Sequence, residues 1–218
     1  RPDTTIIATS YGADLARRMN RDVQRIMDGD EYHRLFPESK LFGANVRTVS
    51  QGSWLRNSDM FEVVGHRGYY LGTGVGGSVT GSGAHVAIID DPVKNRKEAN
   101  SPTYRESVFD WYTSTLYTRL TPDGQVLLTV TRWHEDDLAG RLLALAKSDP
   151  ESDQWVTLIL PALSEDPVAP YDERHVAGKA LWENRWGIDK LRTIERTVGS
   201  RDWASLYQQR PSPDKGEI

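Results

Sequence analysis

The spacing of hydrophobic and polar residues predicts short buried strands that alternate with amphipathic helices. Thr5–Ala8 is a short apolar run with β-branched residues, as in a buried parallel strand. From Ala13, apolar residues recur at helical spacing as far as Met27, and Gly29 favours the end of that helix. Residues 47–71 are typical of short strands separated by turns.

The same pattern continues through the rest of the chain. It predicts strands at residues 84–89, 125–131 and 155–160, and helices at residues 102–116 and about 135–147. Two short helical patterns follow, around residues 191–194 and 203–207, and the proline-containing residues 211–216 indicate a linker. Alternation of strands and helices, with nearly continuous apolar strands, favours an α/β fold with a mostly parallel sheet flanked by helices.

Composition narrows the class of protein. The 218 residues are 38% hydrophobic and 27% charged, which is typical of a soluble globular protein. No run approaches the roughly 20 apolar residues of a membrane helix, and the N-terminus lacks the apolar stretch of a secretory signal. The absence of cysteine excludes disulfides and thiolate metal sites and suits a reducing cytoplasm. We therefore expect a cytoplasmic protein without a membrane partner.

The charge distribution leaves contact with nucleic acid open. A net charge of −4 excludes a uniformly basic nucleic-acid coat. Four arginines nevertheless cluster on the first predicted helix: Arg17, Arg18, Arg21 and Arg25. They form either a solvated helix face or a local contact to phosphates.

The strongest chemical signal is the acidic pair Asp90-Asp91, which follows a predicted buried strand and precedes Pro92. Ligands of open α/β sheets collect at the carboxyl ends of the strands. Two carboxylates there can hold Mg²⁺ and orient a water molecule. The alternative is a strand-ending turn, which Asp-Pro commonly starts. Repulsion between adjacent carboxylates favours the functional interpretation.

A second polar segment, residues 129–134, ends the strand predicted at residues 125–131. Neighbouring parallel strands would place Thr131 and Arg132 near Asp90. A hydroxyl there can sense a phosphate, and a guanidinium can stabilise charge on phosphoryl oxygens. The alternative is a polar exit from a strand. The acids at residues 135–137 precede a predicted helix, where capping explains them better than catalysis.

The glycine-rich stretch Gly72–Gly83 is the most unusual part of the sequence. Glycines allow close approach of the backbone to a ligand. The phosphate-loop pattern G-x-x-x-x-G-K-[ST] occurs neither there nor elsewhere in the chain, and the stretch precedes a strand instead of joining strand to helix. It is either a surface loop or a substrate-contacting one.

Four segments, in order, resemble large terminase subunits of tailed phages and prophages, and the resemblance extends from about Thr4 to Pro213. The segments are Ile6–Val23, Gly76–Ala99, Thr118–Leu143 and Trp203–Pro213. The resemblance implies a P-loop NTPase-like fold and hydrolysis of ATP, with Mg²⁺, coupled to translocation of double-stranded DNA.

The resemblance also implies roles for individual residues. Asp90 matches the Walker B acid that positions Mg²⁺, and we group Thr129 with it as cofactor-binding. Asp91 matches the residue that polarises the attacking water, where many relatives have Glu. Thr131 and Arg132, with the tryptophan after them, resemble the motif that couples phosphate state to movement.

The same resemblance predicts organisation and partners. Residues 1–185 would form the core of the ATPase domain, residues 186–210 its helical end, and residues 211–218 the start of a linker toward a nuclease domain. A portal protein, a small terminase subunit and further copies in a ring would be partners. The family's Walker A loop precedes the strand at Thr5–Ala8, so we expect this chain to be a piece that lacks the Walker A strand-loop-helix. On its own it would turn over ATP negligibly.

Two other functions remain open at this point. A metal-dependent nuclease would use Asp90 and Asp91, with His134 and Asp136, to hold two cations. A non-catalytic module would instead dock onto DNA or a partner subunit. Four arginines are possible fingers for a neighbour's nucleotide, and the sequence does not choose among them: Arg21, Arg67, Arg96 and Arg105.

Overall fold

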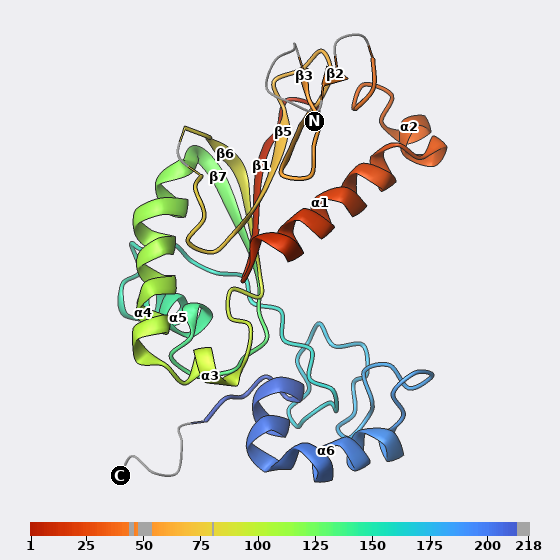
Figure 1. Ribbon diagram of the computed structural model, residues 1–218. Helices are drawn as coiled ribbons and strands as arrows, with labels where there is room; N and C mark the ends of the chain where they lie inside the picture. Colours follow the sequence, from red (N-terminus) through yellow and green to blue (C-terminus); the bar gives the residue numbers. More distant parts are fainter. Residues whose placement is uncertain (44–45, 48–53, 80, 213–218) are drawn as a thin grey trace. The chain divides into compact units, whose positions relative to one another are not determined.

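A computed structural model describes residues 1–43, 46–47, 54–79 and 81–212 (Figure 1). The chain divides into two compact units. The first comprises Arg1–Lys94 and Glu106–Val130, and the second comprises Asn95–Arg105 and Thr131–Ile218. No helix among the described residues is long and apolar enough to cross a membrane.

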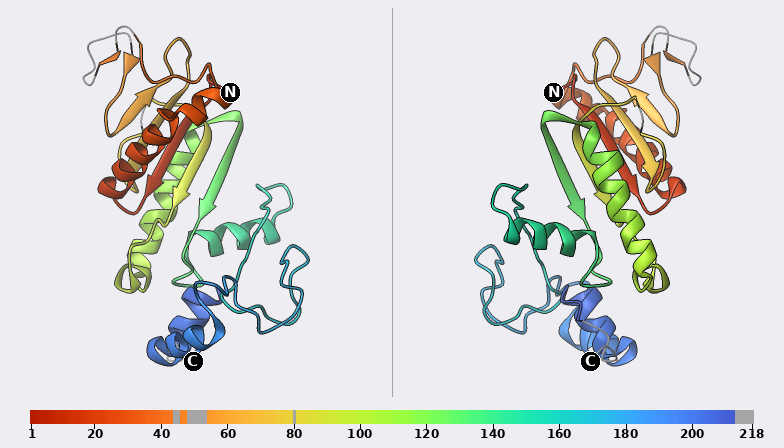
Figure 2. Two further views of the ribbon diagram at one scale, coloured as in Figure 1. Left: turned by 90° about the vertical axis from the view of Figure 1, so that its right-hand side faces the viewer. Right: turned by 90° about the vertical axis from the view of Figure 1, so that its left-hand side faces the viewer.

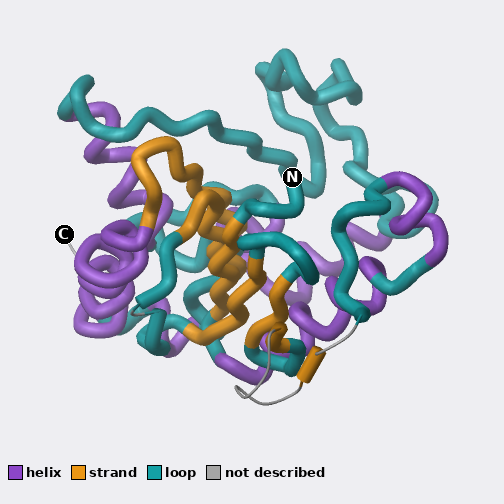
Figure 3. The backbone as a smooth tube through the Cα atoms, turned by 90° about the horizontal axis from the view of Figure 1, so that it is seen from above, coloured by secondary structure: helices purple, strands orange, loops and turns teal. Residues whose placement is uncertain are grey.

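A five-stranded sheet forms the centre of the first unit, and its strands appear as one layer in Figure 3. The strands are β1 (Thr5–Ser10), β4 (Met60–Glu62), β5 (Tyr69–Gly74), β6 (Ala84–Asp90) and β7 (Leu120–Thr129). Their order is β4-β5-β1-β6-β7, and only β4 runs antiparallel to its neighbour. A separate parallel pair joins β2 (Val46–Arg47) to β3 (Trp54–Leu55). The predicted mostly parallel sheet is confirmed.

Helix α1 (Ala13–Met27) packs on one face of the sheet, and the short α2 (Asp30–Leu35) follows it. The core on this face combines Met27 with Ala8, Leu41, Phe61 and Tyr70, and the rings of Phe61 and Tyr70 stack. These residues come from α1, three strands and a loop. Burial of this apolar cluster therefore fixes the helix against β1 and β5.

Glycines of β5 explain how closely α1 approaches the sheet. A Cβ at Gly74 would lie 2.8 Å from the backbone nitrogen of Ala13, and a Cβ at Gly72 would lie 3.2 Å from the carbonyl oxygen of Ala16. A side chain at Gly74 would collide with the helix backbone, and one at Gly72 would require that backbone to shift slightly. The first part of the stretch Gly72–Gly83 thus serves packing.

The other face of the sheet is covered by α4 (Pro102–Trp111) and the turns that continue it, as Figures 1 and 2 show together. The turns are η1 (Tyr112–Leu116) and η2 (Tyr117–Arg119). Val108, Trp111 and Leu116 are buried. The predicted helix start is confirmed, because the Ser101 hydroxyl accepts the backbone N–H of Tyr104 at 3.2 Å.

The described part of the second unit contains three further helices and a terminal turn: α3 (Arg96–Ala99), α5 (Leu138–Ser148), α6 (Ile188–Asp202) and η3 (Trp203–Tyr207). One hydrophobic cluster joins Leu163, Ala180, Leu191 and Trp203. The Gln208 amide accepts from the N–H of Leu163 at 3.0 Å and donates to its carbonyl at 2.9 Å. Helix α6 and turn η3 confirm the two short helical patterns predicted in the tail.

Three predicted elements differ from the structure. Residues 155–160 form no strand: they have no regular secondary structure and are mostly exposed, and Val156 is fully exposed. Strand β7 begins earlier than predicted and ends at Thr129 instead of residue 131, and one of its sides is exposed, including Leu127. Helix α5 begins at Leu138 because Asp137 is its N-cap. Residues 48–50 and 213–218, predicted as strand and linker, lie outside the described residues.

Candidate functional site

Asp90 is the last residue of β6 and lies between the ends of two neighbouring strands. It is in register with Ser10 of β1 and with Thr129 of β7. Strand alternation places Asp90 on the same face as Ile88, which packs against the core under α1. Thr129 is exposed and in register beside it. The structure therefore brings Asp90 and Thr129 together at the carboxyl edge of the sheet.

Burial and charge both act on Asp90. The pKa of the Asp90 carboxyl is raised, first because partial burial disfavours its charged form and second because Asp91 is negative. The pKa of Tyr70 is raised to about 12, mainly by burial and further by the charge of Asp90. A carboxyl whose pKa is shifted by burial and by a neighbouring charge is a candidate functional position.

Asp91 has an unusual backbone conformation, with φ at 44°. Its N–H donates to the carbonyl of Thr129 at 2.9 Å, and its own carbonyl accepts the N–H of Tyr11 at 3.0 Å. The Asp91 backbone thus joins the ends of β1, β6 and β7. A non-glycine residue in the left-handed region is a strained position of the kind that clusters at functional sites.

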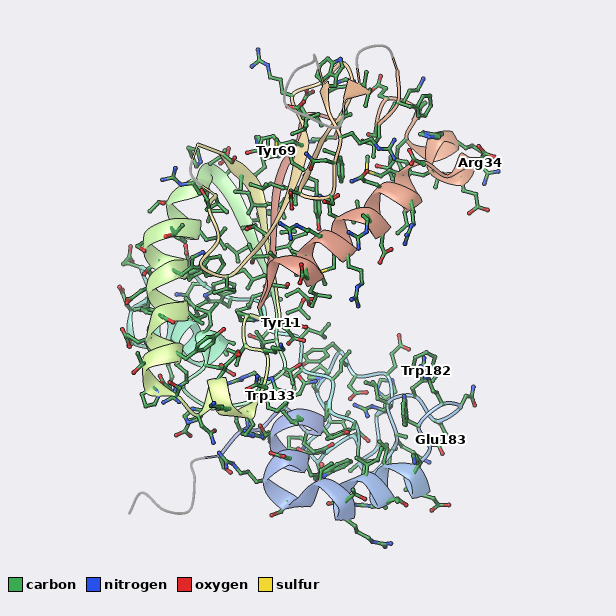
Figure 4. The ribbon with its side chains drawn as sticks, viewed as in Figure 1. Tyr11, Arg34, Tyr69, Trp133, Trp182 and Glu183 are labelled. Carbon is green, nitrogen blue, oxygen red and sulfur yellow. The ribbon has the colours of Figure 1, made fainter. Side chains whose placement is uncertain are left out.

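Tyr11 and Lys94 were not singled out by the sequence. Tyr11 directly follows β1 (labelled in Figure 4), and the Lys94 ammonium lies 5.8 Å from the centre of its ring. The buried Ser10 hydroxyl donates to the Gly12 carbonyl at 2.9 Å and so shapes the turn into α1. Their position in the sequence could have indicated both residues, because residues that follow neighbouring parallel strands meet at one edge of the sheet.

Thr131 and Arg132 follow β7 and belong to the second unit, where Arg132 has an internal partner. Its Nε donates to Oδ2 of Asp137 at 2.8 Å, and both side chains are largely buried. Oδ1 of Asp137 accepts the N–H of Gly140 at 2.8 Å and caps α5. Burial raises the pKa of Asp137, and the charge of Arg132 opposes that shift. Arg132 is therefore held in place by the start of α5.

Asp136 corrects one part of the prediction for residues 135–137, because it does not cap the helix. Its carboxylate accepts from Arg105 at 2.9 Å and from Arg141 at 2.8 Å. These partners, Arg141 first, lower its pKa to about 2. His134 accepts the Asp136 N–H at Nδ1, and its pKa is lowered mainly by burial. Asp137, by contrast, is the predicted cap.

The structure does not support the metal cluster that the nuclease hypothesis requires. Two guanidiniums occupy the Asp136 carboxylate. Within the described ranges, no group of three or more His, Asp or Glu side chains could hold a metal ion. The remaining candidate is the pair Asp90 and Asp91, which by itself offers too few protein ligands for two cations.

The candidate arginine fingers fall into two groups. In the second unit, Arg96 binds Asp202 and the Trp133 carbonyl, and the nearly buried Arg105 binds Asp136. In the first unit, Arg21 and Arg67 are exposed. The arginine cluster of α1 also has acidic neighbours, since ion pairs link Arg17 to Asp59 and Arg25 to Asp22.

Together these features define an open α/β protein with a mostly parallel sheet and an acidic pair at the strand edge where such sheets bind ligands. The family model for the N-terminal part of the T4likevirus-type terminase large subunit matches residues 2–194, and the chain belongs to this family.

A solved structure has the same kind of fold. The crystal structure of the HK97 bacteriophage large terminase matches with a TM-score of 0.50 and 12% sequence identity. The match covers 96% of this chain and 40% of that chain, so this chain spans less than half of the HK97 protein's length. Comparison with curated proteins gives no significant match.

Proposed function

We propose that this chain is the ATP-hydrolysing part of a terminase large subunit and that Asp90 holds the Mg²⁺ that accompanies ATP. The observation that carries the proposal is the placement of Asp90, half-buried at the carboxyl end of β6 and beside Thr129, in a chain of the terminase family. The raised pKa of the Asp90 carboxyl supports the same assignment, because a cation bound beside it would favour the charged form and lower that pKa.

The residues at this edge suit Mg²⁺ and a triphosphate. Carboxylate and hydroxyl oxygens from Asp90, Asp91 and Thr129 are the ligand type that Mg²⁺ prefers. Bound Mg²⁺ would neutralise charge on the phosphate oxygens. In this proposal Asp90 holds the ion, directly or through water, and the Asp91 carboxylate orients the attacking water. The Thr129 hydroxyl contacts the cofactor.

The residues after β7 would couple hydrolysis to movement. We assign Thr131 the role of sensing the phosphate and Arg132 the role of transmitting that state. Support for the Arg132 role comes from its ion pair with Asp137 at the start of α5, through which a shift of Arg132 would reach a helix. The proposal is that this link makes the segment a coupling element.

The wider role follows from the family. We propose that the whole protein moves double-stranded DNA into a procapsid in the cytoplasm of the bacterial host. A portal protein, a small terminase subunit and further copies of the chain in a ring are its proposed partners. These functions belong to the complete motor, of which this chain supplies the ATPase part.

The test is phosphate release with Mg·ATP. Because the sequence contains no G-x-x-x-x-G-K-[ST] pattern, the assay compares the 218-residue chain with a chain joined upstream to a terminase Walker A strand, loop and helix. We expect turnover only from the joined chain. Asp90→Ala should reduce it by about 100-fold or more, because the ion's position is lost.

The matched control is Asp123→Asn, an exposed acid at the other end of β7, which should leave turnover unchanged. Equal turnover by the Asp90→Ala and Asp123→Asn chains would contradict the proposal. Metal-dependent DNA cleavage without ATP would favour the nuclease. Salt-dependent DNA binding that ignores nucleotide would favour the docking module.

A further inference from the structure

The segment that directly follows β7 is anchored to the C-terminal helices of the second unit. The Ser205 hydroxyl donates to the carbonyl of Arg132, and it lies 3.3 Å from the carbonyl of Trp133. Ser205 is almost completely buried. Because a buried hydroxyl without a partner would be costly, these carbonyls and Ser205 hold each other in place.

Arg96 of α3 makes a second anchor on the same segment. One Nη donates to the Trp133 carbonyl, and the other forms an ion pair with Asp202 at the end of α6. The guanidinium carbon also lies 5.2 Å from the centre of a Trp133 ring. Trp133 is labelled in Figure 4 between α3 and the end of α6. Arg96 thus joins three parts of the second unit through one planar group.

The end of α6 is itself fixed to a core. Gly199, with φ at 81°, interrupts the helix and redirects its last turn. Trp203 is buried in the cluster with Leu163 and Leu191, and its ring stacks on Tyr207. Asp202 and Ser205 lie three residues apart and therefore share one side of this turn. The turn contacts the core through Trp203. It contacts the segment after β7 directly through Ser205, and Asp202 is linked to that segment by way of Arg96.

We propose that Arg96, Asp202 and Ser205 are positioning residues that make the segment 131–134 and the helical turn 202–207 move as one body. We name this set the α6 clamp. It rests on the proposed function in one respect: if Thr131 senses phosphate, the clamp carries the movement of the segment 131–134 to α6. The Arg132 side chain contacts Asp137 instead, so α5 and α6 are attached to the segment through different groups.

Hydrogen–deuterium exchange of the 218-residue chain tests the clamp without nucleotide. Asp202→Asn, Ser205→Ala and Arg96→Lys should each accelerate exchange by about three- to tenfold, the scale of one lost hydrogen bond. The acceleration should appear in both peptides, 131–136 and 203–210, whichever side carries the substitution. Glu195→Gln is the matched control, because it breaks an exposed ion pair with Arg192 in the same helix.

Acceleration confined to one of the two peptides, or equal acceleration in the Glu195→Gln chain, would overturn the clamp. A second readout uses a motor that hydrolyses ATP. Asp202→Asn and Ser205→Ala should lower the length of DNA moved per ATP while kcat for hydrolysis changes less than about twofold. A parallel loss of both would overturn the positioning role. If no chain hydrolyses ATP, the proposed function fails, and the exchange result alone decides the clamp.

Discussion

At the scale of single residues, the charge that suits Asp90 to its proposed role lowers the stability of the folded chain. The carboxylate suits a cation, yet burial and the charge of Asp91 raise its pKa in the folded chain. A folded-state pKa above the unfolded value means that folding favours the protonated form. The stabilising contribution is therefore complete below the unfolded pKa of about 4 and is lost as pH rises through the folded value.

This linkage predicts the effect of Asp90→Asn on stability. At pH 7 the substitution removes a partly buried charge, so it should raise Tm by a few degrees in the absence of metal. Near pH 4 the protonated Asp90 resembles Asn, and the difference should shrink. Thermal unfolding of both chains at the two pH values measures it. A lower Tm for the Asn chain at pH 7 would show that the carboxylate stabilises the fold.

At the scale of elements, the contact between α1 and β5 depends on glycine. Gly74→Ala should destabilise the chain by about 1–3 kcal/mol, because its Cβ meets the backbone of α1, which cannot move aside as a side chain can. Urea unfolding gives the value. The control is Gly83→Ala in the loop before β6, where the nearest atom lies 3.9 Å away, so the change should be small. Equal stabilities for the two chains would refute the packing role.

Elements defined by local pattern could be predicted from the sequence, whereas those defined by a distant partner could not. The apolar spacing of α1 and the Ser101-Pro102 start of α4 are local signals, and the structure confirms both. Residues 155–160 have an equally good strand pattern but no partner strand among the described residues, and strand formation depends on that pairing. The exposed side of β7 could not be predicted either, because exposure depends on which distant segments pack against the strand.

Some features of the candidate site could likewise be predicted from the sequence, and others could not. Asp90 and Asp91 could be located because acids after a buried strand have a defined position at the sheet edge. The ion pair between Arg96 and Asp202 joins residues 106 positions apart, and no local sequence pattern predicts it. The partner of Arg132, Asp137, is close in sequence, but its capping role alone did not indicate the ion pair.

At the scale of the whole molecule, family membership and site chemistry support the same account. The family model covers residues 2–194, and the acidic pair lies at the carboxyl edge of the parallel sheet, where ligands of such sheets collect. The predicted domain limits at residues 185 and 210 stay a prediction, since the two compact units divide the chain differently. A motor that changes shape needs such units, and the α6 clamp is a proposed link within one of them.

The central claim is that Asp90 holds the metal ion of a bound nucleotide. Paramagnetic resonance of Mn²⁺, which replaces Mg²⁺ at oxygen sites, tests it in the chain joined to a Walker A segment. If Asp90 holds the ion, we expect a protein-bound Mn²⁺ signal that requires ATP, disappears in Asp90→Asn and persists in Asp123→Asn. Bound Mn²⁺ that needs no nucleotide, or that survives Asp90→Asn, would contradict it.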